Sequence, residues 1–283
     1  MFTTESGLTR NQLYPPFENS KIWPCFGVSE DLVRRWHELV ASYTGLHLTY
    51  ANDRLPAIAA IVEREMRLRP GDTYIAGMWR SSLLTDLGWQ RDYYAFDYPD
   101  ARLKDYVPTW AWPSSKARII WYIGKLEQSL RLVGLFFRRI GPAHVGQVLD
   151  ASIILEGPTY MARRKDVCPS RYNGLRPSIE LISPVPAYRG SKERFHLMWE
   201  DFDWRTGDRP VTTGDTLLIM PIKFFGGCMN PYSLGLILHE VADGDFERIG
   251  VLKLKLGMYG GIEVERLLRD FIDALPIRQV KII

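Results

Sequence analysis

The chain has 283 residues, of which 46% are hydrophobic and 24% are charged, and its formal net charge at pH 7 is +3. This composition is ordinary for a globular protein with a sizeable core. The small charge excludes the broad basic footprint of nucleic-acid-binding proteins, so we expect no nucleic-acid partner. The densest basic run, Arg163-Arg164-Lys165, is expected in a solvated turn.

The cysteines and the apolar stretches indicate the cellular compartment of the protein. Cys25, Cys168 and Cys228 are widely separated and form neither a CxxC pair nor a zinc-binding spacing, which favours a reduced, intracellular protein without a metal. Residues 1–10 lack the apolar region of a signal peptide. The longest apolar stretch, residues 217–222, is far shorter than the roughly 20 residues of a membrane helix. We therefore expect a cytoplasmic protein with no membrane span.

The first part of the chain has helical periodicity. Residues 1–28 are interrupted by proline and glycine and predict an extended N-terminal arm. Apolar residues at helical spacing then predict a helix over residues 29–42. A second helix is predicted from Asp53, its expected N-cap, to residue 68, and a third over residues 73–87.

The second part has the pattern of β-strands. Residues 89–115 lose periodicity but keep many large rings, which predicts an irregular segment packed against the body of the protein. From residue 116, short β-branched and aromatic runs alternate with turn residues. The predicted strands are 119–123, 130–137, 145–155, 195–199, 216–222, 233–239, 248–256 and 278–283, with a helix at 262–274 before the last of them. The expected fold is α+β: an N-terminal helical part (29–115) packed, as one compact unit, on a β-rich barrel or sandwich (116–283) with a late C-terminal helix.

Five segments of the chain match, in order, motifs of a known family. They are DRLPAIA at 53–59, YIAGMWR at 74–80, LGW at 87–89, PTWAW at 108–112, and GLIL at 235–238 followed by DFERIG at 245–250. With these segments the chain resembles the region downstream of the HET module in fungal heterokaryon-incompatibility proteins. The Tyr-x-x-Leu-Ser-Tyr-x-Trp-Gly and Trp-x-Asp-x-x-Cys-Ile motifs of the HET module itself do not occur. The resemblance therefore implies a fungal protein that has the scaffold of this region without the effector module.

No familiar catalytic motif is evident. The sequence has no HExxH motif and no nucleophile elbow, and its Gly-Gly pairs lack the context of a phosphate loop. His239 and Glu240 are neighbours on a predicted strand, so they should point to opposite faces, and His37 and Glu38 diverge on the first helix. We interpret the histidines as structural or surface residues. The acidic run at 200–203 could hold a metal or a proton-transferring pair, but is more typical of a solvated loop.

The tryptophans allow two interpretations. They could form an interlocking core between the two parts of the chain, or they could line a mostly apolar cavity with a few polar anchors. In the second case the predicted substrate-binding residues are Trp79, Trp89, Trp110 and Trp112, and the predicted catalytic hydrogen-bond donors are Arg80, Arg118 and Tyr122.

Two functions from different classes remain open. The first is a cofactor-independent enzyme of fungal secondary metabolism, a cyclase that binds a small hydrophobic substrate. An intramolecular cyclisation of Diels–Alder type on a terpenoid or polyketide needs only a folded substrate and a polarised carbonyl group. The second is a non-enzymatic binding or regulatory protein in heterokaryon incompatibility or innate immunity, which predicts an exposed apolar surface.

Overall fold

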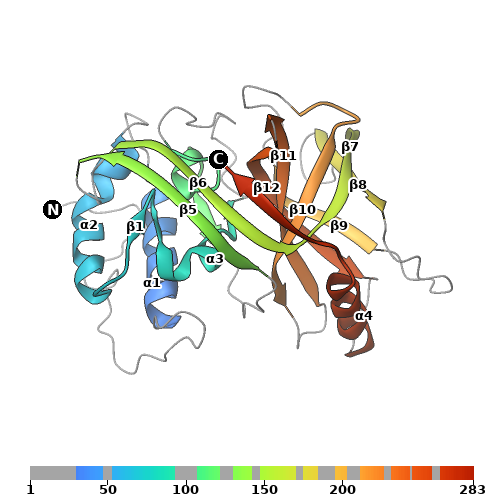
Figure 1. Ribbon diagram of the computed structural model, residues 1–283, viewed down its shortest axis with the longest axis horizontal. Helices are drawn as coiled ribbons and strands as arrows, with labels where there is room; N and C mark the ends of the chain where they lie inside the picture. Colours follow the sequence, from blue (N-terminus) through green and yellow to red (C-terminus); the bar gives the residue numbers. More distant parts are fainter. Residues whose placement is uncertain are drawn as a thin grey trace.

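The computed structural model describes residues 30–46, 53–92, 107–121, 130–141, 147–169, 175–183, 195–202, 211–225, 231–242, 244–256 and 262–283. The fold is α+β, as predicted, with helices at the N-terminal end, a large mixed sheet and a late C-terminal helix (Figure 1). The described strands follow an open order, so the sheet is not a closed barrel. None of the described helices is long and apolar enough to cross a membrane.

The first two predicted helices are present. They are α1 (Glu30–Thr44) and α2 (Arg54–Leu68). On the apolar face of α1, Trp36 and Val40 are fully buried and Leu39 is nearly so, as their spacing predicts. Asp53 occupies the N-cap position of α2, but its side chain makes no capping hydrogen bond.

The predicted third helix is wrong. The segment forms a short hairpin and two single helical turns, namely β1 (Tyr74–Ile75), β2 (Met78–Trp79), the 3-10 turn η2 (Arg80–Ser82) and α3 (Leu83–Asp86). The hairpin turns at Ala76 and Gly77, whose φ angles are 50° and 96°. Two successive residues at positive φ make a tight hairpin turn and cannot continue an α-helix.

One large sheet of nine described strands forms the rest of the body. The strands are β5 (Arg131–Ile140), β6 (Gln147–Pro158), β7 (Tyr160–Pro169), β8 (Leu175–Ser183), β9 (Phe195–Phe202), β10 (Thr216–Phe225), β11 (Tyr232–Ala242), β12 (Asp245–Leu256) and β13 (Ile277–Ile282). Their order is β5-β6-β13-β12-β11-β10-β7-β8, and β9 pairs with β12. The β12–β13 pair is parallel and the other pairs are antiparallel. A separate small pair joins β3 (Trp89–Arg91) to β4 (Ile119–Trp121).

Two strands of the large sheet, β7 and β8, were not predicted from the sequence, and β3 lies in the segment 89–115 that was predicted to be irregular. The basic triplet Arg163-Arg164-Lys165 lies in the middle of β7, so its prediction as a solvated turn is wrong. Arg164 is buried and its guanidinium donates a hydrogen bond to the backbone carbonyl of Val211. Residues 200–202 of the acidic run lie in β9 rather than in a loop, and Asp203 lies outside the described residues.

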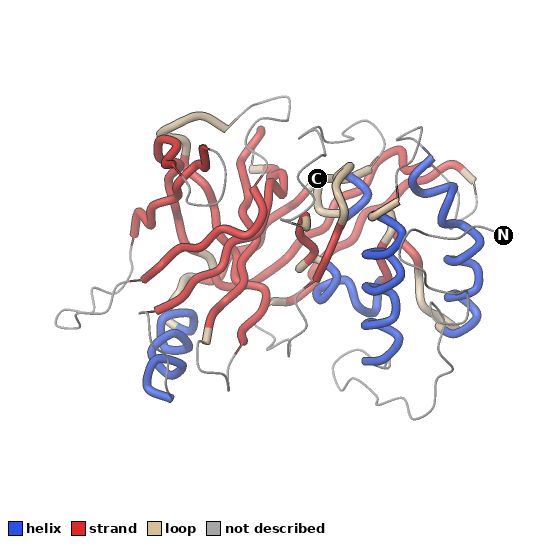
Figure 2. Tube along the Cα trace, turned by 180° about the vertical axis from the view of Figure 1, so that it is seen from behind, coloured by secondary structure: helices blue, strands red, loops and turns tan. Residues whose placement is uncertain are grey.

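The central strands are buried on both faces. In β10, Leu218 and Met220 belong to a core cluster shared with the N-terminal helices, whereas Leu217 and Ile219 belong to a second cluster that includes residues of α4 (Ile262–Asp273). Figure 2 shows the N-terminal helices at one end of the molecule and α4 at the other, with the sheet between them. The long strands β5 and β6 extend from the sheet across the N-terminal helices (Figure 1).

Candidate functional site

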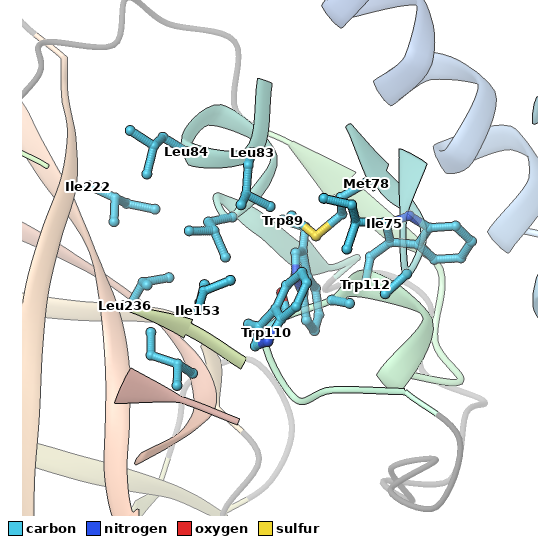
Figure 3. Close-up of a cluster of buried hydrophobic side chains, with 14 of the residues drawn as sticks. Ile75, Met78, Leu83, Leu84, Trp89, Trp110, Trp112, Ile153, Ile222 and Leu236 are labelled. Carbon is cyan, nitrogen blue, oxygen red and sulfur yellow. The ribbon is translucent and has the colours of Figure 1, made fainter. Parts of the chain in front are cut away.

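The four tryptophans predicted to bind substrate are core residues in this structure. Trp79, Trp110 and Trp112 are 0% exposed and Trp89 is 1% exposed. Trp89, Trp110 and Trp112 lie among apolar side chains of both parts of the chain (Figure 3), and Trp79 of β2 belongs to the same core cluster. A ring without exposed surface touches a ligand only if its neighbours move, so the substrate-binding role of these residues stays a prediction.

Of the predicted catalytic residues, the two that the structure describes, Arg80 and Arg118, are exposed, whereas the four tryptophans are buried. Arg80 is exposed, and the side chain of Arg118, 47% exposed, pairs with Asp92 at 3.4 Å. Tyr122 lies outside the described residues.

Other arginines cover the tryptophan rings. Arg69 lies over Trp79, Arg54 over Trp112 and Arg248 over Trp89.

A different set of polar side chains meets under the N-terminal helices, and we call His37, Asp86 and Lys223 the polar centre. His37 comes from α1, Asp86 ends α3, and Lys223 belongs to β10, so three separate elements supply it. The His37 ring and an Asp86 carboxylate oxygen lie 2.7 Å apart, Nε2 to Oδ1. Sites assembled from several elements at the junction of two parts of a fold are typical of small-molecule binding.

Asp86 is fully buried, and both of its carboxylate oxygens and its backbone carbonyl have hydrogen-bond partners. Its Oδ2 accepts hydrogen bonds from the Ser82 hydroxyl at 2.9 Å and from the Trp79 backbone amide at 3.2 Å. Its backbone carbonyl accepts a hydrogen bond from the Trp121 indole at 2.8 Å. Because this carboxylate is held by fixed donors, it fixes in turn the orientation of His37.

The His37 ring is held on two sides. It stacks on the Trp121 ring with the centroids 4.2 Å apart and the planes at 3°. Because a carboxylate only accepts hydrogen bonds, a neutral His37 donates Nε2–H to Asp86 and keeps the lone pair on Nδ1. No residue in the described part of the chain is hydrogen-bonded to Nδ1. The side chain is 12% exposed, so Nδ1 is the atom that remains for a ligand or a proton.

A β-bulge directs Lys223 to this side of the sheet. The pairing of β10 with β11 shifts between Pro221 and Lys223, which adds one residue to β10. Beyond the shift, Phe225 belongs to the core cluster of the N-terminal helices and Phe224 to the opposite cluster. The alternation of side chains therefore places Lys223 on the face of Phe225. Bulges of this kind commonly re-aim a side chain next to a functional site.

The Lys223 ammonium reaches the backbone beside Asp86. A Cβ atom built on Gly88 would lie only 3.3 Å from Lys223 Nζ, so the missing side chain of Gly88 makes room for the amine. Lys223 is 3% exposed. Among the residues that the structure describes, none accepts a hydrogen bond from its ammonium or forms an ion pair with it within 4.0 Å.

Burial controls the protonation of the polar centre. It lowers the pKa of Lys223 to about 8, and the charge of Asp86 opposes this shift. Burial also lowers the pKa of His37, against the hydrogen bond and the charge of Asp86, and the charge of Lys223 lowers it further. At pH 7 His37 is therefore neutral, with a free lone pair, and Lys223 exchanges readily between ammonium and amine.

The arrangement offers a hydrogen-bond donor or a nucleophile at Lys223 and a base at His37 Nδ1. Such groups act on a polar atom, such as a carbonyl oxygen, of a molecule whose remainder is apolar. In the described part of the chain, no three His, Cys, Asp or Glu side chains come together as they would around a metal ion.

Sequence reasoning missed all three residues of the polar centre, although two of them carried a signal. Lys223 follows the apolar run 217–222 inside a strand that is buried on both faces, where a charged residue needs an explanation. His37 lies next to the apolar face of the first helix. The prediction that His37 and Glu38 diverge is confirmed, since Glu38 is exposed. It gave no indication that His37 pairs with Asp86, which lies 49 residues further along the chain.

Comparisons with known proteins yield no match: no family model, no curated protein and no solved structure is similar to the chain. The resemblance to the region downstream of the HET module therefore stays a prediction, based on the five sequence segments alone.

Proposed function

We propose that the protein is an enzyme of fungal secondary metabolism that cyclises a small apolar substrate, such as a terpenoid or a polyketide, without a cofactor. The reaction is an intramolecular cyclisation of Diels–Alder type, and the polar centre acts on a carbonyl group of the reacting substrate.

One observation carries the proposal: Lys223 is a buried cation without a hydrogen-bond or ion-pair partner in the described part of the chain. A buried charge without a partner costs several kcal/mol, so ordinary proteins pair it or replace it. We therefore attribute the unpaired ammonium of Lys223, close to the His37–Asp86 pair, to ligand binding.

The chemistry of a cyclisation suits these groups. A donor on the carbonyl oxygen withdraws electron density from the conjugated double bond and makes it more reactive toward the diene. The rest of the acceleration comes from holding the two reacting ends of one molecule close together, which requires shape rather than ionisable catalysts. In this proposal the apolar side chains of the core cluster near the polar centre surround the substrate and hold its shape.

The test compares the metabolites of the producing organism with and without the gene, by liquid chromatography and mass spectrometry. We expect one product to disappear and an isomeric, uncyclised precursor to accumulate. Complementation with H37N should leave at least about tenfold less product than the wild-type gene, because a positioned base or donor contributes roughly 10²-fold or more. R67A serves as the control and should restore the product, because the Arg67 side chain on α2 is 76% exposed. An unchanged profile without the gene would contradict the proposal.

A second candidate is the non-enzymatic binding or regulatory protein of the incompatibility response. The observation that favours it is the apolar surface on β5, the last strand at one end of the described order, where Phe136 is 53% and Val133 is 41% exposed. Single exposed apolar residues are common on soluble proteins, so this observation weighs less than a buried unpaired cation. F136S should abolish partner binding in this case and leave the metabolite profile unaffected.

A further inference from the structure

We infer that Lys223 is a nucleophile that forms an imine with an aldehyde or ketone, so that the substrate of the polar centre is an apolar molecule with a free carbonyl group. This inference rests on the proposed function for its biological role, but the site itself is argued from its geometry and from the reactivity of the amine.

The first step of the argument is the position of the amine. The bulge between Pro221 and Lys223 turns this side chain toward the N-terminal helices, where apolar residues surround the polar centre. A Cβ atom built on Gly88 would lie 3.3 Å from its Nζ, and the charge of the Asp86 carboxylate, which pairs with His37, acts on the amine. The amine is thus buried on the side of an apolar core cluster, and such surroundings favour an apolar carbonyl compound.

The second step is the missing partner. A lysine that only stabilised the fold would donate its three hydrogens to carbonyl or carboxylate oxygens. Lys223 is more than nine-tenths buried and makes no such bond with the described residues. By contrast, the exposed lysines Lys165 and Lys281 form ion pairs of 2.8 Å with Glu180 and Asp245. The buried lysine is free for a ligand where the exposed ones are paired.

The third step is reactivity. Only a neutral amine attacks a carbonyl carbon, and desolvation of a lysine is a known way to obtain one near neutral pH. With its pKa lowered to about 8, Lys223 has a neutral fraction at pH 7 that is on the order of 100-fold larger than that of an ordinary lysine. His37, whose Nδ1 keeps a lone pair, lies within the electrostatic influence of the amine and is suited to move protons during the addition.

The covalent step is balanced without any further reagent. The amine nitrogen bonds to the carbonyl carbon, and the carbonyl oxygen leaves as water with the two amine hydrogens. The product is a carbon–nitrogen double bond. When it becomes protonated, it withdraws electrons from an adjacent alkene more strongly than a hydrogen bond does, which favours cyclisation. Water reverses the step and releases the product as a carbonyl compound.

The experiment uses the purified full chain, 3-phenylpropanal as the probe and cyanoborohydride as the reductant at pH 7. The reductant delivers hydride to the imine carbon and fixes the adduct as a secondary amine. The saturated aldehyde cannot react with cysteines by conjugate addition. Peptide mapping by mass spectrometry then gives the labelling rate of each lysine. We expect Lys223 to be labelled at least about tenfold faster than Lys165, because its neutral fraction is larger.

Two variants and one condition serve as controls. K223R keeps the positive charge, removes the nucleophile and should lose only the fast-labelled site. G88A places a methyl group 3.3 Å from the position of Nζ, so it should slow the labelling of Lys223 and leave that of Lys165 unchanged. In a urea-unfolded sample, Lys223 should react like the other lysines.

A labelling rate of Lys223 equal to or below that of Lys165 in the folded protein would overturn the inference. That result is separate from the metabolite test. A gene-dependent cyclised product without Lys223 labelling would leave the proposed function standing, with Lys223 as a hydrogen-bond donor only. Fast labelling with an unchanged metabolite profile would support the imine site and contradict the cyclase.

Discussion

At the scale of single residues, the core contains two kinds of buried charge. Asp86 is fully buried, and its carboxylate is held by His37, Ser82 and the Trp79 backbone amide. Glu65 is likewise fully buried and pairs with Arg35 at 2.9 Å, while burial raises its pKa. Lys223 is buried without a comparable partner in the described part of the chain. The first two charges hold the structure together, whereas the third weakens it.

The first prediction concerns stability at Lys223. Its pKa falls from 10.5 in the unfolded chain to about 8 in the folded protein. Below pH 8 the folded state therefore carries the full cost of the buried ammonium, about 3 kcal/mol at roughly 1.4 kcal/mol per pKa unit. K223M removes this cost and keeps the side-chain volume, so the free energy of unfolding at pH 7 should rise by about 1–3 kcal/mol. Urea unfolding followed by circular dichroism measures it.

The sign of the pH dependence provides the control. Between pH 8 and 10.5 the unfolded chain binds more protons than the folded protein at Lys223, so the wild type gains stability with rising pH relative to K223M. The charged groups near Lys223, Asp86 and His37, are the same in both proteins. A lower stability of K223M at pH 7 would show that the ammonium has a structural partner.

The second prediction compares two aspartates. D86A should lower the free energy of unfolding by more than about 3 kcal/mol, because it leaves a buried hydroxyl, an amide and an imidazole without their acceptor. D92A makes the same chemical change in the pair with the half-exposed Arg118, where the loss should be below about 1 kcal/mol. Equal losses in chemical denaturation would mean that Asp86 does not organise this region.

At the scale of elements, the periodicity of apolar residues predicted those helices and strands whose formation depends on local sequence. Helices α1, α2 and α4 and most strands follow from apolar spacing. The predicted alternation is confirmed over residues 252–255, since Leu252 and Leu254 are buried and Lys253 and Lys255 are partly exposed. The third helix failed because Gly77 has a left-handed backbone that the pattern of its neighbours does not reveal. Strand β7 was missed because Arg164 interrupts an apolar pattern while its partner, Val211, lies 47 residues away.

The third prediction tests the turn that replaces the predicted helix. Gly77 has a φ of +96°, and a Cβ atom there would lie 2.6 Å from Pro113 Cγ and 2.8 Å from the Trp112 indole nitrogen. Since both neighbours are buried, G77A should cost about 2–4 kcal/mol in the free energy of unfolding. At Gly71, with a φ of +82° and no atom within 4 Å, the same substitution carries only the backbone cost of about 1 kcal/mol. Similar values for G71A and G77A would contradict the close packing at Gly77.

At the scale of the whole molecule, the helical part and the sheet share one core. The larger cluster joins Trp36 and Trp79 of the helical part to Leu236 and Val251 of the sheet. Arg248 of β12 is fully buried over the Trp89 ring, 3.5 Å from its centroid, and donates a hydrogen bond to the Trp89 carbonyl. The sequence predicted that the two parts pack together. It could not predict the polar centre, because the distances between His37, Asp86 and Lys223 depend on this packing rather than on local pattern.

The fourth prediction is that both parts unfold together. Because the core cluster extends across the junction, tryptophan fluorescence, which reports mainly on the helical part, and the far-ultraviolet signal of the sheet should change at the same urea concentration. R248M should shift both midpoints equally. Two separate transitions in the wild type would indicate that the parts are independent domains.

The measurement that tests the central claim most directly is the metabolite profile of a gene-deletion strain complemented with K223M. Within the polar centre, Lys223 is proposed to serve catalysis and not the fold, so K223M should be at least as stable as the wild type, accumulate to the same level and yet fail to restore the cyclised product. A strain in which K223M restores the full amount of product would contradict the role of Lys223 and, with it, the polar centre as the catalytic site.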